Sequence, residues 1–304
     1  MKIRTVMEKI LPDSWVPYIL HLRPRAWPIV AAHMSAGFFL ANGFTFGSDT
    51  LQRLLIAILT WTILGNGGTL AINSYYDQDE GDIGYLDDPP TPPKYLHLFS
   101  LLLMVLGLPL AAYLGSRFLI VYTICMTLSV IYSVPPMRAK ARGGIDVLIN
   151  SIGYGGLTFY AGWAALNRPF DATIINVVLG FMFLFAGFYP LTQIYQMEED
   201  RRRGDNTLAV RLDKRNALRF AAAAVIIAFV FFVGEVTARY FELRALGILI
   251  SLLLWGVFLI HWNTHYASVD NAYEKKGFYK ALWIWAVTDI SVVVAMAPLL
   301  FTSS

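Results

Sequence analysis

Apolar segments of about 20 residues recur along the chain, and this recurrence constrains its fold more than any other feature. Each is long enough to cross a hydrocarbon core of roughly 30 Å as a helix. Of the 304 residues, 57% are hydrophobic and 15% charged, whereas soluble proteins carry about 25% charged residues. The sequence therefore predicts an all-α, polytopic membrane bundle of about nine transmembrane helices in a single domain, 1–304. The segments lie at about 26–46, 52–75, 95–115, 117–134, 145–166, 173–196, 217–237, 244–262 and 279–301.

Basic residues gather on one side of this predicted bundle. Most of the 24 Lys and Arg residues lie before the first segment or in every second loop after it. Basic loops stay in the cytoplasm. We therefore expect a multi-pass protein of the cell (inner) membrane, with the N-terminus and these loops cytoplasmic and the C-terminus outside. Residues 1–25 are predicted to be a cytoplasmic interfacial segment, in which 3–10 form an amphipathic helix or, alternatively, a frayed tail.

Two acidic clusters follow apolar segments on the predicted cytoplasmic side. Residues four apart share one helix face, so Asn73 and Asp77 project together, as do Gln196 and Asp200. Carboxylate and amide oxygens suit Mg²⁺, which also binds substrate phosphates. The clusters predict a Mg²⁺ site in which they face each other across a central cavity, and helix capping by acidic residues is the alternative. The first cluster continues through Asp79, Glu80 and Asp82, and the second includes Glu198, Glu199 and Asp205.

The loop after the fourth segment supplies complementary positive charge. Pro135 and Pro136 are expected to end the preceding helix and to force an extended path. In an extended segment, residues two apart point to one side, so Arg138, Lys140 and Arg142 would form a cationic row. Arg binds phosphate bidentately and Lys acts as a mobile point charge. The row predicts a phosphate site, with ordinary cytoplasmic loop charge as the alternative.

These motifs resemble those of the UbiA superfamily of intramembrane prenyltransferases. The resemblance covers nearly the whole chain, and Arg23-Pro24-Arg25-Ala26-Trp27-Pro28 is similar to that family's entry segment. The matching motifs are Asn73-xxx-Asp77 with trailing acids, Tyr132-Ser-x-Pro-Pro-x-Arg-x-Lys, and Asp200-xxx-Gly204-Asp205-Asn206-Thr207-Leu208.

The resemblance implies a nine-helix bundle with a central cavity that opens to lipid. Mg²⁺ held by the two acidic motifs would bind an isoprenyl diphosphate, whose chain would lie in an apolar, aromatic-rich tunnel. The prenyl group would pass to a lipophilic acceptor, for which an aromatic compound is favoured. Metal and basic side chains would neutralise charge on the leaving diphosphate.

The same resemblance assigns roles to individual residues. It implies catalytic roles for Asp77, Asp200, Tyr132 and Lys140. Diphosphate binding falls to Arg23, Arg138, Lys140 and Arg142. Metal ligation falls to Asn73, Asp77, Asp82, Gln196 and Asp200. The chain departs from the family pattern at Ser74, at Gly81 and at Gln196, where acids are usual, so the metal count stays open.

Several alternatives remain open at this level. A cation-coupled transporter is the main competitor, but transporters place ion sites near the bilayer midplane, whereas these acids lie at segment ends. A terpene cyclase of the same fold is another. The net charge of +3 and the lack of nucleic-acid motifs exclude nucleic-acid binding. Asn150, Ser151 and Tyr154 either line the cavity or pack between helices, Asp289 is either functional or bonded to a neighbouring helix, and Cys125 is expected to be a core residue.

Overall fold

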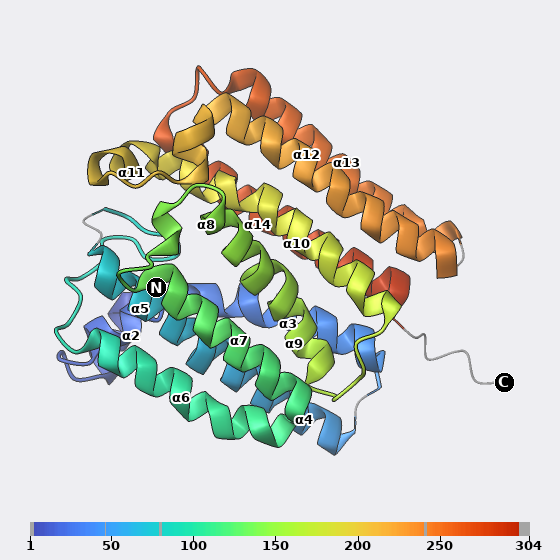
Figure 1. Cartoon of the computed structure of the whole chain (residues 1–304), viewed down its shortest axis with the longest axis horizontal. Coiled ribbons are helices and arrows are strands. Elements are labelled where there is room, and N and C mark those ends of the chain that lie inside the picture. The colour runs from blue at the N-terminus through green and yellow to red at the C-terminus, as the bar shows by residue number, and fades with distance from the viewer. Residues whose placement is uncertain (1–2, 46, 79–80, 240–241, 298–304) are drawn as a thin grey trace.

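Long helices lie side by side in one bundle (Figure 1). The computed structural model describes residues 3–45, 47–78, 81–239 and 242–297. Within these ranges the regular elements are helices. Two isolated β-bridges lie in the loops between them. The predicted all-α, polytopic fold is therefore confirmed.

The helices follow the predicted segments closely. The amphipathic α1 covers Ile3–Ile10, as predicted, and a short α2 covers Val16–His21. The first predicted segment is α3, Trp27–Asn42, and the third and fourth are α6, Leu96–Leu114, and α7, Ser116–Ser133. The last three are α12, Leu208–Arg239, α13, Ala245–His265, and α14, Asn271–Met296. Residues 298–301 of the ninth segment lie outside the described residues.

Three segments are divided by local changes of helix type. The second consists of α4, Ser48–Ile58, the π-helical η2, Leu59–Asn66, and α5, Gly67–Asp77. The fifth consists of α8, Ile145–Asn150, the π-helical η4, Ser151–Leu157, and α9, Thr158–Ala164. The sixth consists of α10, Ala172–Gln193, the 3₁₀ turn η5, Ile194–Gln196, and α11, Met197–Arg203. Minor 3₁₀ turns are η1, Pro24–Ala26, η3, Ala139–Ala141, and η6, Glu242–Arg244.

Among the described residues, 7 helices are long and apolar enough to cross a membrane. The first predicted segment falls short because α3 has 16 residues. The fifth, which includes η4, is also not among the seven, whereas the second, which includes η2, is. The seventh segment is preceded by a helical turn that begins at Leu208, and the two meet at a kink at Asp213, where φ is 63° and ψ is 159°. The first turns of α12 carry Arg211, Lys214 and Arg215, so apolar length alone detects only the part of α12 beyond them.

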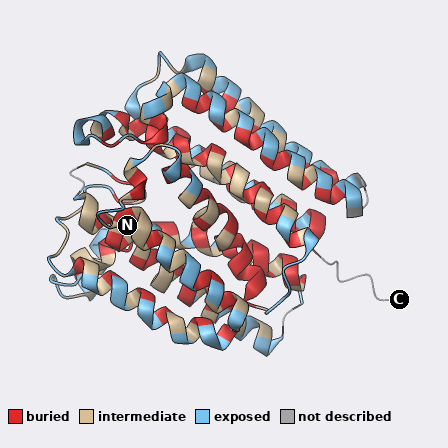
Figure 2. Cartoon of the chain, viewed as in Figure 1, coloured by how far each residue is buried: buried red, intermediate tan, exposed pale blue. Residues whose placement is uncertain are grey.

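Exposed residues lie along the outside of the bundle (Figure 2), and many of them are large and apolar. Exposed residues include Leu102 and Val105 on α6, and Leu253, Val257 and Ile260 on α13. In water such surfaces are uncommon on a monomer, whereas lipid tails solvate them. The exposed faces of α6 and α13 are therefore suited to contact lipid.

The centre of the bundle depends on close contact between α3 and α9. A methyl group added at Gly162 would lie 1.9 Å from the carbonyl oxygen of Met34, and one at Gly37 would lie 1.9 Å from that of Phe159. Only glycine permits these backbones to touch, as small residues do in membrane helix pairs. This contact sets the position of α3 against the cavity described below.

The loops predicted to be cytoplasmic meet at one end of the bundle. The Asn271 amide donates to the Tyr195 carbonyl at 2.7 Å, and the backbone N–H of Asn206 donates to the Ala141 carbonyl at 3.2 Å. Lys275 joins the same end, because its Nζ lies 2.7 Å from a carboxylate oxygen of Asp82 in the α5–α6 loop. In Figure 1, α2, α5 and α11 mark this end at the left.

Candidate active site

A cavity of about 300 Å³ opens among α3, α5, α7, η4, α10 and α14. Its residues change in character along its length. Charged and amide side chains of the two acidic motifs line one part, and the aromatic residues Phe185, Phe188 and Trp285 line another. The cavity thus combines a polar mouth with an apolar interior, as the two-cluster prediction requires.

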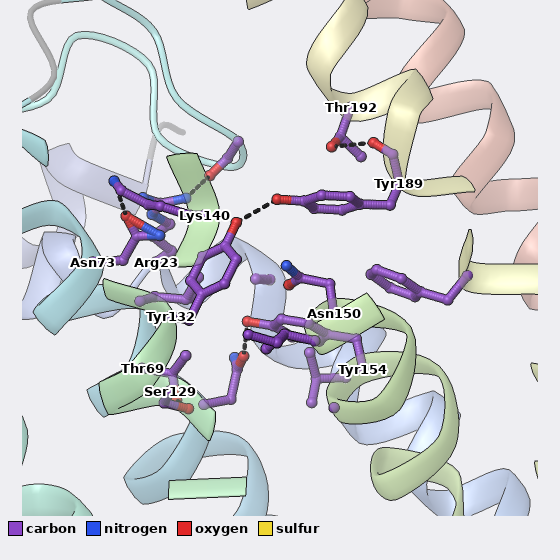
Figure 3. A pocket seen from close by; sticks show the side chains of 18 of the residues that line it. Arg23, Thr69, Asn73, Ser129, Tyr132, Lys140, Asn150, Tyr154, Tyr189 and Thr192 are labelled. Carbon is purple, nitrogen blue, oxygen red and sulfur yellow. Dashed lines mark hydrogen bonds between the residues drawn. The ribbon is translucent and has the colours of Figure 1, made fainter. Parts of the chain in front are cut away.

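The first motif presents its side chains along one face of α5. Asn66, Thr69, Asn73 and Asp77 all line the cavity, since their spacing of three or four residues keeps them on one face. The Lys140 ammonium contacts Oδ1 of Asp77 and lies 3.5 Å from Oδ1 of Asn73. Figure 3 shows Lys140 beside Asn73. A cation therefore already sits between the two predicted ligands.

The second motif reaches the same cavity from α10 and α11. Gln196 and Asp200 both line it, so the predicted meeting of the two clusters is found. Asp200 accepts hydrogen bonds from Arg203 at 3.2 Å and from the Thr207 hydroxyl at 3.3 Å. Asp205, which also lines the cavity, was not among the predicted site residues. Gln196 donates to the Asp82 carbonyl at 3.3 Å, which ties η5 to the α5–α6 loop.

The predicted extended conformation of the cationic row is wrong. Arg138 has a left-handed φ of 32° and is followed by the 3₁₀ turn η3, so the segment is not extended, although Arg138 and Lys140 both reach Oδ1 of Asp77, Arg138 at 3.9 Å. Lys140 alone of the three lines the cavity. Arg138 instead donates to both carboxylate oxygens of Asp205, at 2.8 and 3.3 Å. Arg142 makes a backbone bridge to Asn206.

Lys140 is held in a strongly desolvated position. Lys140 is 8% exposed. Burial lowers the pKa of its amine to about 7, although the nearby carboxylate of Asp205 raises that pKa. Desolvation disfavours the charged form of an amine. An incoming phosphate group would favour the charged form, so this lysine is suited to bind an anion.

Arg23 supports the mouth from the N-terminal side. It lines the cavity, and its guanidinium donates to the Ser74 hydroxyl at 3.2 Å and to the Gly84 carbonyl at 3.3 Å. These bonds hold the α5–α6 loop against the cavity, where Tyr85 is also part of the lining. Burial raises the pKa of Tyr85 well above its usual range.

Of the remaining predicted site residues, Asp82 lies outside the cavity and Tyr132 lies inside it. Asp82 is absent from the cavity lining; its carboxylate pairs with Lys275 at 2.7 Å and accepts from the Asp88 N–H at 2.9 Å. Asp79 and Glu80 lie outside the described residues. The Tyr132 hydroxyl bonds to that of Tyr189 inside the cavity, as Figure 3 shows.

Sequence reasoning missed Asp146, which organises the second motif without lining the cavity. The residue is 0% exposed. Its carboxylate accepts from the Gly144 N–H at 2.7 Å, the Gln193 amide at 2.7 Å and the Leu208 N–H at 3.0 Å. It thereby joins α8, α10 and the start of α12. An acidic residue at the beginning of an apolar segment was the available signal, because buried acids are costly unless paired.

The interior of the cavity is aromatic, with one buried polar cluster. The Tyr154 ring stacks on Phe185 at 5.5 Å. His33, also in the lining, contacts the Asp289 carboxylate through Nδ1 at 2.7 Å and the Gly155 carbonyl through Nε2 at 3.1 Å. Asp289 is thus bonded to a neighbouring helix. Asn150 and Tyr154 line the cavity, Ser151 does not, and Cys125 lies on its wall.

The polar mouth has the chemistry that Mg²⁺ requires. Asn73, Asp77, Gln196 and Asp200 offer hard oxygen atoms to one cavity, and the Lys140 ammonium occupies a cation position between two of them. The described residues contain no group of three or more His, Cys, Asp or Glu side chains that could hold a metal alone. The donor set therefore fits a Mg²⁺ that shares its coordination with substrate phosphate and water.

Comparison with known proteins agrees with this arrangement. The chain is 25% identical over 262 residues to chlorophyll synthase of Oryza sativa, covering 80% of this chain and 68% of that protein. It is 25% identical over 283 residues to lycopene elongase/hydratase of Haloarcula japonica, covering 90% and 93%. A solved UbiA homolog from Archaeoglobus fulgidus, bound to DMAPP and Mg²⁺, matches with a TM-score of 0.70 and 20% identity over 91% of this chain and 98% of that one.

The family itself follows from a match to a sequence profile. The profile of the UbiA prenyltransferase family covers residues 27–287, which include both acidic motifs and all of the cavity lining except Arg23 and Ala26. The solved homolog has the same overall helical fold, which aligns with 91% of this chain. The chain is therefore a multi-pass membrane enzyme of the UbiA prenyltransferase family.

Proposed function

We propose that this protein transfers an isoprenyl group from an isoprenyl diphosphate to a lipophilic, aromatic-type acceptor within the membrane, in a Mg²⁺-dependent reaction. The observation that carries the proposal is one cavity that joins two acidic motifs and a buried lysine to an aromatic interior. A diphosphate matches the polar mouth, and an isoprenoid chain matches the apolar part. The solved homolog with DMAPP and Mg²⁺ supports the same donor chemistry.

The basic side chains would act on the diphosphate end of the donor. Lys140 and Arg23 line the mouth, while Arg138 lies behind it and pairs with Asp205. Bound Mg²⁺ would add charge neutralisation on the departing diphosphate. Placing these charges in a site with little water strengthens their effect on a developing anion.

The aromatic interior would act on the isoprenoid end. Ionisation of an allylic diphosphate leaves positive charge on carbon, which aromatic faces stabilise. Tyr132, Tyr189, Phe185 and Trp285 line this part of the cavity. The surrounding helices would also exclude water, which otherwise captures the cation.

Diphosphate release tests the proposal directly. Purified protein in lipid nanodiscs would receive geranyl, farnesyl or geranylgeranyl diphosphate and an acceptor pool from membrane extract, with Mg²⁺ or EDTA. We expect Mg²⁺-dependent release, because the acidic motifs need a metal to hold an anion. Asp77→Ala and Asp200→Ala should each reduce release by about 100-fold or more, the scale of removing one electrostatic catalytic group.

Glu198→Ala is the matched control, since this acid belongs to the second cluster but is exposed and outside the cavity lining. It should retain release. No release with any chain length from folded protein would overturn the assignment. Release that gives a rearranged hydrocarbon without acceptor would replace transfer with terpene cyclisation.

A further inference from the structure

A second polar level lies deeper in the cavity than the predicted diphosphate ligands. Asn66 lines the cavity and precedes Asn73 by seven residues, which corresponds to about 10 Å along a helix. The Tyr154 hydroxyl donates to Oδ1 of Asn66 at 2.8 Å. The two residues belong to the π-helical segments η2 and η4. Such segments occur frequently at functional sites.

The side-chain nitrogen of Asn66, Nδ2, has no hydrogen-bond partner among the described residues. Among the described residues, Tyr154 has no acceptor for its hydroxyl proton other than Oδ1 of Asn66, which fixes the orientation of the amide. Nδ2 of Asn66 is then buried without a hydrogen-bond partner in the described chain, and the residue is 7% exposed. Buried polar groups are nearly always bonded, so this donor calls for a ligand atom.

Neighbouring polar groups in the same region are already satisfied. The Thr69 hydroxyl bonds to the Gly65 carbonyl at 3.0 Å, and the Ser129 hydroxyl bonds to the Cys125 carbonyl at 2.8 Å. Thr69 and Ser129 also lie 2.8 Å apart, and Figure 3 shows them together. Thr62 on η2 and Ser151 on η4 also have a buried hydroxyl oxygen without a partner among the described residues, but neither lines the cavity, whereas Asn66 does.

We propose that Asn66 and Tyr154 form an acceptor-recognition site for a carbonyl-type oxygen carried by a planar, lipophilic compound. The inference rests on the proposed prenyl transfer, for which it specifies the acceptor. An isoprenoid tail or a hydrocarbon acceptor offers no atom that accepts from Nδ2. The Tyr154 ring, stacked on Phe185 with 11° between planes, provides a flat apolar surface beside the vacant donor, which suits a planar ring that bears the oxygen.

A matched pair of binding probes tests this site without turnover. 2-Acetylnaphthalene and 2-ethylnaphthalene have the same ring and similar size but differ in one carbonyl oxygen. Equilibrium dialysis would compare protein nanodiscs with empty nanodiscs, which corrects for partition into lipid. We expect the wild-type protein to retain the ketone about fivefold more strongly, the scale of one net hydrogen bond. In Asn66→Leu the two probes should be retained about equally.

Two further variants make the test specific. Tyr154→Phe frees the Asn66 amide to turn and should also lower the preference. Ser251→Ala is the control, because Ser251 bonds to Ser291 between α13 and α14, away from the cavity lining; its preference should equal that of wild type. Equal retention of both probes by the wild-type protein, or an undiminished preference in both Asn66→Leu and Tyr154→Phe, would overturn the proposal.

The outcome is separable from that of the proposed function. A protein that prefers the ketone but releases no diphosphate would contradict prenyl transfer and leave a carbonyl-binding cavity. A protein that releases diphosphate but shows no preference would retain the proposed function and lose the acceptor site.

Discussion

At the scale of single residues, the buried acid Asp146 joins three segments around the site without lining the cavity. Its carboxylate accepts from Gly144, Gln193 and Leu208, and the Gln193 carbonyl oxygen in turn accepts from the Ala209 N–H at 3.2 Å. These bonds satisfy N–H groups in the first turn of α12, which have no partner within that helix. They place the start of α12 beside Thr207 and Asp200.

Asp146→Ala should destabilise the protein by about 3–5 kcal/mol, because three donors, two of them in buried hydrogen bonds, would lose their acceptor. The midpoint of thermal unfolding in detergent micelles measures this loss. Asp146→Asn is the matched control, since it keeps one carbonyl oxygen and the same volume, and should be destabilised less. Equal stability of wild type and the alanine variant would contradict the structural role.

At the scale of helices, His33 and Asp289 join three elements in the middle of the bundle. His33 lies on α3, Asp289 on α14 and the Gly155 carbonyl on η4. The π-helical turn that carries Gly155 also carries Tyr154. Buried ionisable groups within a membrane span are costly unless paired, so this pair holds η4 in place against its two neighbours.

Asp289→Ala would leave the His33 ring without its carboxylate partner in an apolar interior. We expect a loss of about 2–4 kcal/mol in the free energy of unfolding, measured by denaturation in mixed micelles. Asp289→Asn keeps an oxygen that can accept from His33 and should lose less. A wild-type unfolding curve for Asp289→Ala would show that the pair does not hold η4.

The α5–α6 loop is attached to the mouth by ion pairs. Lys275 contacts Asp82 and Asp87 at 2.7 and 2.9 Å, and Arg25 contacts Asp87 at 2.8 Å. The Lys275 and Arg25 side chains hold the pKa of Asp87 below its usual value. A lowered carboxyl pKa stabilises the folded state above the unfolded pKa, and this contribution is lost as pH falls through the folded pKa.

Lys275→Met should therefore loosen the loop at neutral pH, whereas lowering the pH of the wild type to about 5 should not, since carboxyl groups stay ionised there. Exposed ion pairs contribute only about 0–1 kcal/mol each, so amide exchange over residues 83–88 should rise by a few-fold. Lys276→Met is the control, because no ion pair of Lys276 is found among the described residues. Unchanged exchange in Lys275→Met would contradict the attachment.

At the scale of the whole molecule, both acidic motifs and the basic loops meet at one end of the bundle. The contacts between Asn271 and Tyr195 and between Lys275 and Asp82 fix this arrangement. We propose that this end is cytoplasmic, because it carries most of the positive charge. Water-soluble isoprenyl diphosphate headgroups would then enter from the cytoplasm.

Cysteine labelling tests this orientation. Cys125 is the chain's single cysteine, so Cys125→Ser gives a background without thiols. Arg202→Cys and Ser268→Cys, exposed at the motif end, should react with a membrane-impermeant maleimide only after the cell membrane is opened. Ser48→Cys, at the first residue of α4 and at the opposite end of the bundle, should react in intact cells. The reverse pattern would invert the topology.

The sequence alone predicted where the helices lie and which face of α5 carries Asn73 and Asp77. The apolar segments located the helices, because a span must satisfy its backbone bonds internally and so must be long, apolar and helical. The spacing of Asn73 and Asp77 placed both on the cavity face of α5, because that spacing matches the helical repeat. These features depend on residues close together in the chain.

Contacts between distant residues needed the tertiary structure. Arg138 pairs with Asp205 at 2.8 Å, and Asp82 pairs with Lys275 outside the cavity. The vacant donor at Asn66 becomes visible only once Tyr154, from another helix, is bonded to its carbonyl oxygen. Charge and hydrogen-bond partners are decided by which groups meet when helices pack. Residue spacing along one helix predicts its face but not its partner on the next.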